Sequence, residues 1–115
     1  MKKPSIVSLL PAAALTATGA GDGVDIREFE GEAFLVLDAS AEAESTLDVT
    51  LEQSDDGEDF EPVASVEFEQ VTDAAVSFQT VGIQTDGLGP YVRAVATVAG
   101  TSVVCSLSLV GRTKY

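Results

Sequence analysis

Strict alternation of apolar and polar residues is the feature that most restricts the fold of this chain. In residues 46–52 (TLDVTLE), Leu47, Val49 and Leu51 share one side of an extended backbone, and acidic and hydroxyl residues share the other. A two-residue period is typical of a β-strand with one buried and one solvated face. The same period returns in residues 91–98 and 103–109, and no segment has a convincing helical stripe. These patterns predict an all-β chain.

A β-hairpin is predicted around the first of these segments. Residues 54–57 (SDDG) interrupt the alternation, because Asp side chains cap turns and Gly57 tolerates a positive φ. The alternation resumes with Val66 and Phe68 on one side and glutamates on the other. We therefore expect residues 46–71 to form a hairpin with a long acidic connection, whose apolar face needs further strands to cover it.

Two strands and a loop are predicted before this hairpin. Residues 24–29 alternate, and Gly31 is expected to end that strand. Residues 33–37 (AFLVL) are continuously apolar, as in a strand that is buried on both faces. The small and acidic residues 38–45 predict a loop.

After the hairpin, a turn at residues 72–73 is expected to lead into a strand that runs to about residue 81 or 83. The pattern places Val76 and Phe78 inward on this strand, and Ser77 and Gln79 outward. Residues 85–90 (TDGLGP) are rich in Gly and Pro and predict a loop.

A second hairpin is predicted at the end of the chain, with residues 99–101 (AGT) as its tight turn. The inward positions of its strands are Val92, Ala94, Ala96, Val98, Val103, Cys105, Leu107 and Leu109. The outward positions include Val95, Val104 and Val110, which are more apolar than a solvated face requires. Either the hairpin lies between two layers, or these valines belong to a subunit or partner interface.

About seven or eight short antiparallel strands, with turn signals between them, predict a single β-sandwich of jelly-roll or Ig-like type. The 115 residues are enough for one domain with its own core. Residues 1–20 are expected to form an extended N-terminal arm or edge strand, and residues 21–115 the sandwich. Lys2-Lys3 and the apolar residues 6–15 also resemble a secretory signal with a cleavage site after Ala17, but Pro11 interrupts the apolar run and favours the arm.

The charge restricts the partners. With 19 acidic and 6 basic residues, the formal net charge is −13. Such a chain repels the phosphates of nucleic acids and the headgroups of anionic membranes, so we expect neither as a partner. No run of apolar residues is long enough for a transmembrane helix.

The residue types restrict the chemistry. The chain has no histidine, which removes the commonest general base and metal ligand, and Cys105 is its single cysteine. Cys105 alternates in phase with the inward residues of its strand, so we expect it to pack in the core rather than act as a nucleophile. Arg93 is expected to form an ion pair with a cross-strand Asp or Glu, with an interface contact as the alternative. No pair of carboxylates is placed for glycoside hydrolysis.

An acidic cluster of Asp55, Asp56, Glu58, Asp59 and Glu61 is the one candidate metal site. Its oxygen density suits Ca²⁺, but Gly57 is not at the position that a calcium loop requires. We expect a solvated turn, with Ca²⁺ binding as the alternative. The sequence thus predicts no catalytic, cofactor-binding or metal residues, no cofactor and no enzyme activity.

Short motifs along nearly the whole chain resemble a family of small structural proteins of tailed bacteriophages, found among head and decoration components. They are Leu9–Ala13 (LLPAA), Thr16–Gly19 (TATG), Asp22–Ile26 (DGVDI), Glu30-Gly31, Leu35–Asp38 (LVLD), Leu47–Val49 (LDV), Glu52–Gly57 (EQSDDG) with Phe60, Tyr91–Ala94 (YVRA), Gly100-Thr101 and Leu109–Arg112 (LVGR).

This resemblance implies a non-enzymatic virion protein, with capsid decoration as its role. It implies the major capsid protein as partner, homo-oligomers such as trimers, and a location on the outer capsid surface after assembly in the host cytoplasm. The alternatives are a tail-tube or head–tail connector subunit, a secreted bacterial surface protein, and a carbohydrate-binding surface module. The last would use exposed aromatic side chains, for which Phe29, Phe60, Tyr91 and Tyr115 are the candidates.

Overall fold

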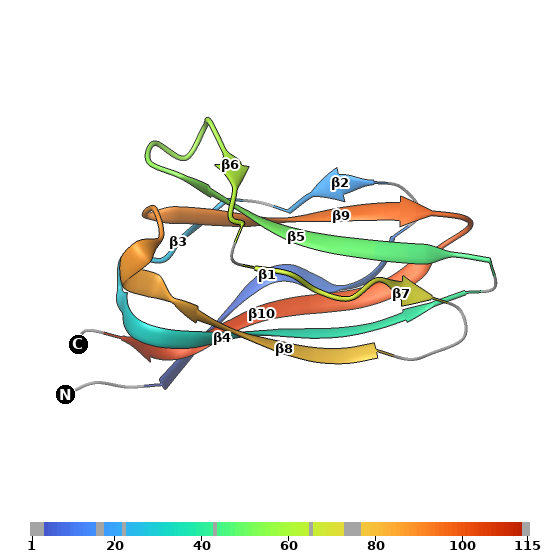
Figure 1. The fold of residues 1–115 in the computed structure, drawn as a ribbon, viewed down its shortest axis with the longest axis horizontal. Helices are drawn as coiled ribbons and strands as arrows, with labels where there is room; N and C mark the ends of the chain where they lie inside the picture. Colours follow the sequence, from blue (N-terminus) through green and yellow to red (C-terminus); the bar gives the residue numbers. More distant parts are fainter. Residues whose placement is uncertain are drawn as a thin grey trace.

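The computed structural model describes residues 4–15, 18–21, 23–42, 44–64, 66–72 and 77–113. Within these residues the chain is almost entirely β-structure, arranged as two packed antiparallel sheets (Figure 1). The predicted all-β sandwich is therefore confirmed. Its elements are β1 (Pro4–Leu15), β2 (Gly19–Ala20), β3 (Val24–Asp25), β4 (Phe29–Ala41), β5 (Thr46–Ser54), β6 (Glu61–Pro62), β7 (Val71–Thr72), β8 (Ser77–Gln84), a 3₁₀ turn η1 (Thr85–Gly87), β9 (Tyr91–Ala99) and β10 (Val103–Thr113).

The strand order identifies the sandwich as a jelly roll. The first sheet has the order β1-β10-β4-β8, and the second has the order β2-β9-β5-β6, with β3 also paired to β9 and β7 to β5. The chain therefore crosses between the sheets after β1, β3, β4, β7, β8 and β9. Because β2 and β3 both pair with β9, and β6 and β7 both pair with β5, each layer has four strand positions. Two such layers connected in this interleaved way are the double Greek key of jelly-roll domains, which distinguishes this fold from the Ig-like alternative.

The core lies between the two sheets and is built from the alternating residues that the sequence predicts for β5, β9 and β10. Leu47, Val49 and Leu51 of the second sheet are buried, facing the first sheet. From β9 and β10, the buried residues are Val92, Ala94, Ala96, Val103, Cys105, Leu107 and Leu109. Cys105 is thus a core residue, as predicted, and burial raises the pKa of its thiol.

The N-terminal segment contributes a strand and part of the core. β1 pairs with β10 from Pro4↔Arg112 to Leu15↔Val103 and is a terminal strand of the first sheet. Leu9 and Leu10 are buried, and the register shifts on both sides of Leu10, next to Pro11. A proline lacks the N–H needed for a regular ladder, so it is tolerated at an edge or a bulge. The separation of residues 1–20 as an arm distinct from the body stays a prediction.

Three predictions for β4 are wrong. The strand passes through Gly31, which has a positive φ of 68° beside a register shift in the pairing with β10, and it continues to Ala41 rather than ending in a loop at residue 38. The run 33–37 is buried on one face only: Ala33, Leu35 and Leu37 are buried, and Phe34 is 45% exposed. One face of the first sheet therefore remains uncovered by the second.

The inward placement of Phe78 is also wrong. In β8, Gln79, Val81 and Ile83 pair with Leu37, Leu35 and Ala33. This register turns Phe78 away from the core, where it is 68% exposed. Val76, the other residue predicted to face inward, and Asp73 of the predicted turn lie outside the described residues.

The predicted hairpin at residues 99–101 is an arch between the sheets, because β9 and β10 belong to different sheets. Ser45 stabilises it: its Oγ accepts hydrogen bonds from the N–H groups of Thr101 and Ser102 at 2.9 and 3.2 Å. The hairpin at residues 46–71 is confirmed in part. β5 pairs with β6 and β7 at the two ends of the second arm, while residues 66–70 between them form no regular strand although Val66 is buried as predicted.

Candidate functional site

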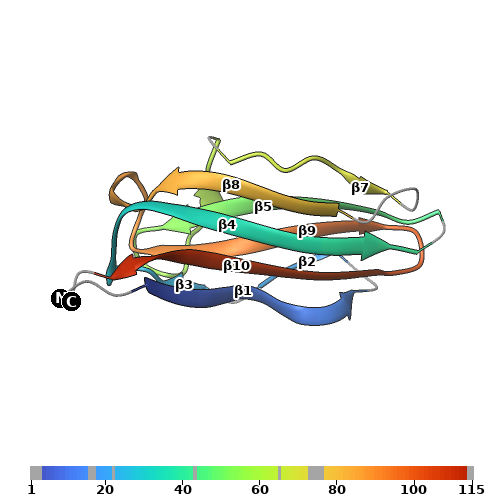
Figure 2. The same ribbon diagram turned by 90° about the horizontal axis from the view of Figure 1, so that it is seen from below.

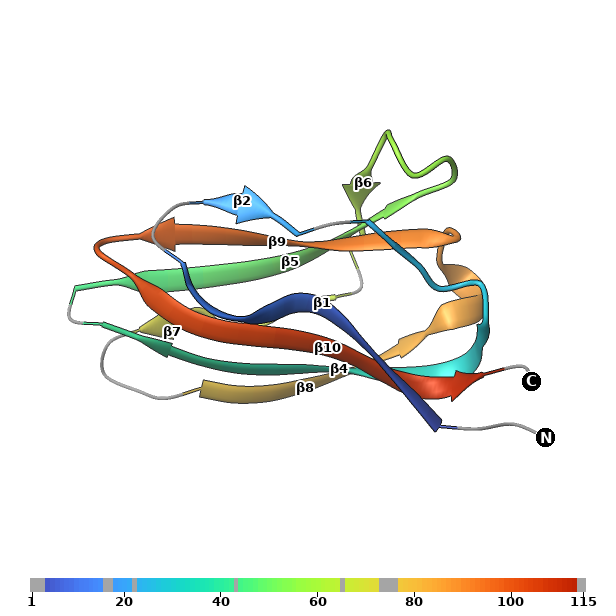
Figure 3. The ribbon, with the colours of Figure 1, turned by 180° about the vertical axis from the view of Figure 1, so that it is seen from behind.

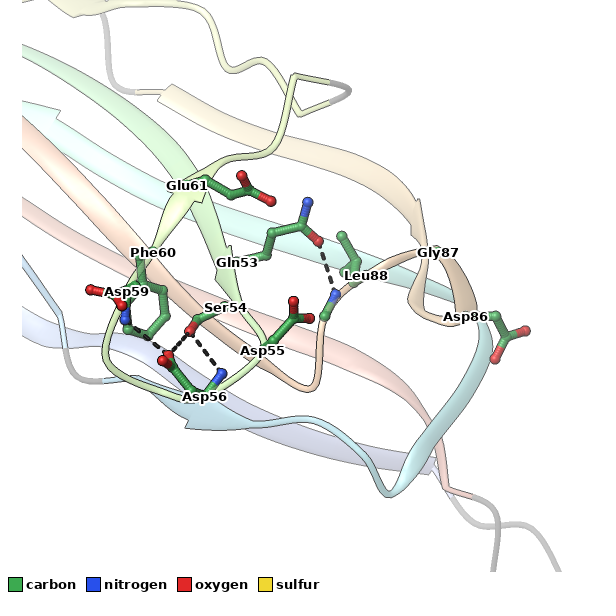
Figure 4. Close-up of a pocket in the computed structure, with 11 residues that line it drawn as sticks. Gln53, Ser54, Asp55, Asp56, Asp59, Phe60, Glu61, Asp86, Gly87 and Leu88 are labelled. Atoms are coloured by element: carbon green, nitrogen blue, oxygen red, sulfur yellow. Dashed lines mark hydrogen bonds between the residues drawn. The ribbon is translucent and has the colours of Figure 1, made fainter.

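A polar hollow at one end of the sandwich gathers most of the predicted acidic cluster (Figure 4). It has a volume of about 570 Å³ and lies between the loop after β5 and the loop that contains η1. The amide of Gly89 donates a 2.9 Å hydrogen bond to Oε1 of Gln53, which ties the two loops together. Asp55, Asp56, Asp59 and Glu61 come from the first loop and Asp86 from the second. Figure 4 shows Asp86 on the opposite side of the hollow from Asp56.

Hydrogen bonds within the first loop give one of its acidic residues, Asp56, a structural role. Ser54 Oγ accepts from the N–H groups of Asp56 and Gly57 and donates to Oδ1 of Asp56 at 2.8 Å. The same Oδ1 accepts the N–H groups of Glu58 and Asp59 at 2.8 and 3.0 Å. These donors favour the charged carboxylate and lower the pKa of Asp56 to about 2. Asp56 and Ser54 are thus the side chains that shape the turn.

The hollow does not bring its carboxylates together as metal ligands. Among the residues that the structure describes, no group of three Asp, Glu or Cys side chains is placed to hold a metal ion. Asp56 Oδ1 is already engaged by backbone donors and Ser54. Calcium binding at residues 55–61 remains an untested alternative, and the expected lack of catalytic, cofactor and metal residues stays a prediction.

Arg93 forms the predicted cross-strand ion pair. It stands opposite Glu52 on β5, and its Nε lies 2.7 Å from Oε1 of Glu52. The Arg93 guanidinium carbon also lies 4.3 Å from the centre of the Phe60 ring, within cation–π distance. In the turn after β3, Arg27 stacks over Tyr91 at 5.5 Å and is hydrogen-bonded to Asp25, whose pKa falls to about 2.

These contacts remove the aromatic platform that the carbohydrate-binding alternative requires at the predicted positions. Phe29 is buried, while Phe60 and Tyr91 are half-buried beneath arginine side chains. Tyr115, the fourth candidate, lies outside the described residues.

The outward surface of the first sheet is the more unusual feature, and we call it the exposed face. It carries all four of the large hydrophobic side chains that are exposed among the described residues: Ile6, Phe34, Phe78 and Val104. The sequence suggested Val104 as an interface residue but missed the other three. The alternation within β4 could have revealed Phe34, because it lies between Ala33 and Leu35, which both face the core.

The jelly-roll fold is shared with viral and prophage proteins. No protein-family model matches the sequence, and no curated protein matches it significantly. Several solved structures are similar in fold. The VP2 subviral particle of infectious bursal disease virus aligns with 97% of this chain at 10% identity and a TM-score of 0.66. The SPBc2 prophage-derived protein YomS aligns with 96% of this chain at 13% identity and a TM-score of 0.60.

These similarities differ in how much of the neighbour they include. This chain spans about a third of VP2 (33%) but 96% of YomS. The structure of the Gt strain of infectious bursal disease virus is a further neighbour, with 12% identity and a TM-score of 0.55 over 34% of that chain. At such low identities the shared property is the fold. Among the described residues, no helix has the length and hydropathy needed to span a membrane.

Proposed function

We propose that this chain is a non-enzymatic structural protein of a bacteriophage virion, and that it decorates the outside of the head shell. The observation that carries the proposal is the jelly roll that the whole chain shares with YomS, a prophage-derived protein of nearly the same extent, and with the VP2 subviral particle. A jelly roll is common in viral capsids but also occurs in lectins and enzymes, so the fold alone does not fix the role.

The charge supports an exterior position. A net charge of −13 would be repelled by the packaged DNA inside a head, whereas it is compatible with a surface that faces solvent. It also discourages adhesion between decorated particles. The major capsid protein is the partner that this position implies.

The N-terminal region supplies the proposed contact with the shell, together with residues 91–110. β1 is a 12-residue strand at the edge of the first sheet. Figure 3 shows β1 and β2 along the same side of the sandwich, beside β10 and β9. A long edge strand offers unpaired backbone groups to which a strand of another protein can add. Pairing of this kind would join the decoration protein to a shell subunit and allow it to bridge to a neighbour.

The proposal is tested by adding the purified protein to empty shells that lack it and separating bound from free protein by sedimentation. We expect saturable binding and shells that withstand a higher temperature. Ser8→Lys places a charge on β1, and Thr50→Lys places the same charge on β5 of the opposite sheet as a control, since both side chains are exposed and Thr50 lies outside the proposed contact. Ser8→Lys should weaken binding and Thr50→Lys should not.

Three results would contradict parts of this proposal. Shells that gain neither protein nor heat resistance would exclude a decoration role. Assembly of the pure protein into rings or tubes without any shell would favour the tail-tube or connector alternative. Equal binding by both lysine variants would exclude β1 as the contact.

A further inference from the structure

The exposed face contains a contiguous surface of apolar and small polar side chains, with one carboxylate, Asp38, within it. Strand pairing aligns its outward side chains in rows across the sheet. Figure 2 shows the four strands of this sheet from their outer side. The first row is apolar throughout: Ile6 pairs with Val110, Val110 with Phe34, and Phe34 with Gly82. Ile6 is 70% exposed. The ring of Phe34 lies beside Gly82, where an added Cβ would be 3.7 Å from the Cε1 atom of Phe34.

The following rows are small and polar, with apolar residues at their ends. The second row is Ser8, Ser108, Val36 and Thr80, and the third is Ser106, Asp38 and Phe78. Val104 and Ser40 form the fourth with β1 beside them. Of the 19 acidic residues, only Asp38 belongs to these four rows as the structure describes them. Flat surfaces of hydroxyl and apolar side chains can approach one another without desolvating many charges.

The other sheet has a different outer surface. There, Asp48 lies opposite Thr97 and Glu52 lies opposite Arg93, and no large hydrophobic side chain among the described residues is exposed. The remaining acidic clusters lie in loops at the ends of the sandwich, such as residues 55–61 and residue 86. A basic partner would be attracted to those surfaces rather than to the exposed face. We therefore expect the occupant of the exposed face to present few charges itself.

We propose that this occupant is a second copy of the chain, packed face to face through a two-fold axis. Most surfaces of a chain with a charge of −13 would bring carboxylates against carboxylates, whereas the four rows of the exposed face contribute one per copy, Asp38; the exposed Glu32 lies outside these rows, beyond Phe34. A two-fold interface uses the same patch on both subunits, so a patch compatible with itself is sufficient. Sheets stacked in this manner interdigitate their side chains at a separation of about 10 Å.

The size of the face sets the strength of this dimer. Four strands about 4.8 Å apart and a stretch of about seven residues along β4 give roughly 500 Å² per copy. Two copies then bury about 1,000 Å², which is at the lower limit for a specific interface. The dimer is therefore weak, with dissociation in the micromolar range. Salt strengthens it, because screening reduces the repulsion between two chains of the same charge.

Analytical ultracentrifugation of the full chain, without any shell, tests this proposal. The mass should rise from 11.9 kDa toward twice that value as the concentration increases from about 1 µM to about 500 µM. The rise should shift to lower concentration in high salt. A chain that stays monomeric over this range in both low and high salt would overturn the proposal.

A matched pair of variants identifies the face. Thr80→Asp adds a carboxylate to the exposed face, and Thr50→Asp adds the same group to the outer face of the second sheet; both threonines are exposed strand residues. Thr80→Asp should raise the dissociation constant about tenfold or more, because each two-fold interface gains two charges. Thr50→Asp should leave it unchanged. The reverse order, or equal effects, would overturn the assignment to this face.

Phe78→Ser tests the apolar contribution, and circular dichroism confirms that each variant is folded. Since Phe78 is 68% exposed, its removal should not affect folding but should weaken the dimer. Dimerisation at the full strength of the unmodified chain in Phe78→Ser would contradict the proposal. The result is independent of shell binding, because the dimer forms, or fails to form, in the absence of a shell.

Discussion

Replacing Leu9 by alanine tests whether the N-terminal strand is part of the folded body. Leu9 is 2% exposed, although β1 is a terminal strand of its sheet. Buried Leu→Ala substitutions lose transfer free energy and leave a cavity, at a cost of about 2.7–5.0 kcal/mol. An edge strand can move inward and fill part of that cavity. We therefore expect Leu9→Ala to lower the free energy of unfolding by about 3 kcal/mol.

Two further alanine variants bracket this value. Leu107 is 0% exposed and lies on β10, between β1 and β4, so its surroundings can relax less. Leu107→Ala should cost about 4 kcal/mol. Ile6 is on the same strand as Leu9 but is 70% exposed, so Ile6→Ala should change the free energy of unfolding by less than about 0.5 kcal/mol.

Urea unfolding followed by far-ultraviolet circular dichroism measures these differences at a fixed, low protein concentration. For a domain of this size, about 3 kcal/mol corresponds to a decrease in Tm of about 12 °C. If Leu9→Ala unfolds at the same urea concentration as Ile6→Ala, β1 is not packed on the core. The proposed shell contact would then need a detachable arm instead of a fixed edge strand.

Three other perturbations test local features of the fold. Gly100 has a φ of 99°, and an added Cβ would lie 2.5 Å from the carbonyl oxygen of Glu44, so Gly100→Ala should cost about 2 kcal/mol or more in thermal melts. Gly87→Ala is the control, since no atom lies within 4 Å of its added Cβ. The pKa of Asp56 is lowered from 3.8 to about 2, so its stabilising contribution is complete above pH 4 and is lost as the pH falls toward 2; an Asp56 carboxyl that titrates near 3.8 by NMR would contradict the described turn. A double-mutant cycle on Arg93 and Glu52 should give a coupling of about 0.5 kcal/mol that decreases in high salt, and a coupling of zero would show that the 2.7 Å pair does not persist in solution.

The sequence predicted which side chains of β5 and β10 face the core, because successive side chains of a strand point to opposite faces. Leu47, Leu51 and Leu107 are buried as the alternation predicts. Arg93 could be assigned an acidic cross-strand partner because few other partners suit an outward arginine in so acidic a chain, and Glu52 is that partner. Such predictions need only the local pattern and the overall charge.

The connectivity between sheets could not be read in this way. Gly100 and its neighbours indicate a reversal of the chain, but a hairpin and an arch between sheets use the same turn residues. The difference depends on Ser45, which is distant in sequence and binds the N–H groups of Thr101 and Ser102. The jelly-roll order depends on many such long-range contacts.

The exposed face was missed because a local apolar pattern does not reveal which side of a strand is covered. Phe34 lies in an apolar run, and its exposure follows from the burial of Ala33 and Leu35 on the other side of β4. In the sequence, Phe78 alternates with Val76, which predicted that Phe78 faces the core. The pairing of β8 with β4 shows that Phe78 faces outward instead. The candidate interface therefore emerges only when the register of four strands is known.

Cryo-electron microscopy of shells with and without this protein tests the central claim of an external structural role most directly. We predict additional density the size of a jelly-roll domain on the outer surface of the decorated shells, with the β1 edge directed at a shell subunit. Identical outer surfaces in the two reconstructions, or density for this chain only in the tail or inside the shell, would contradict the account.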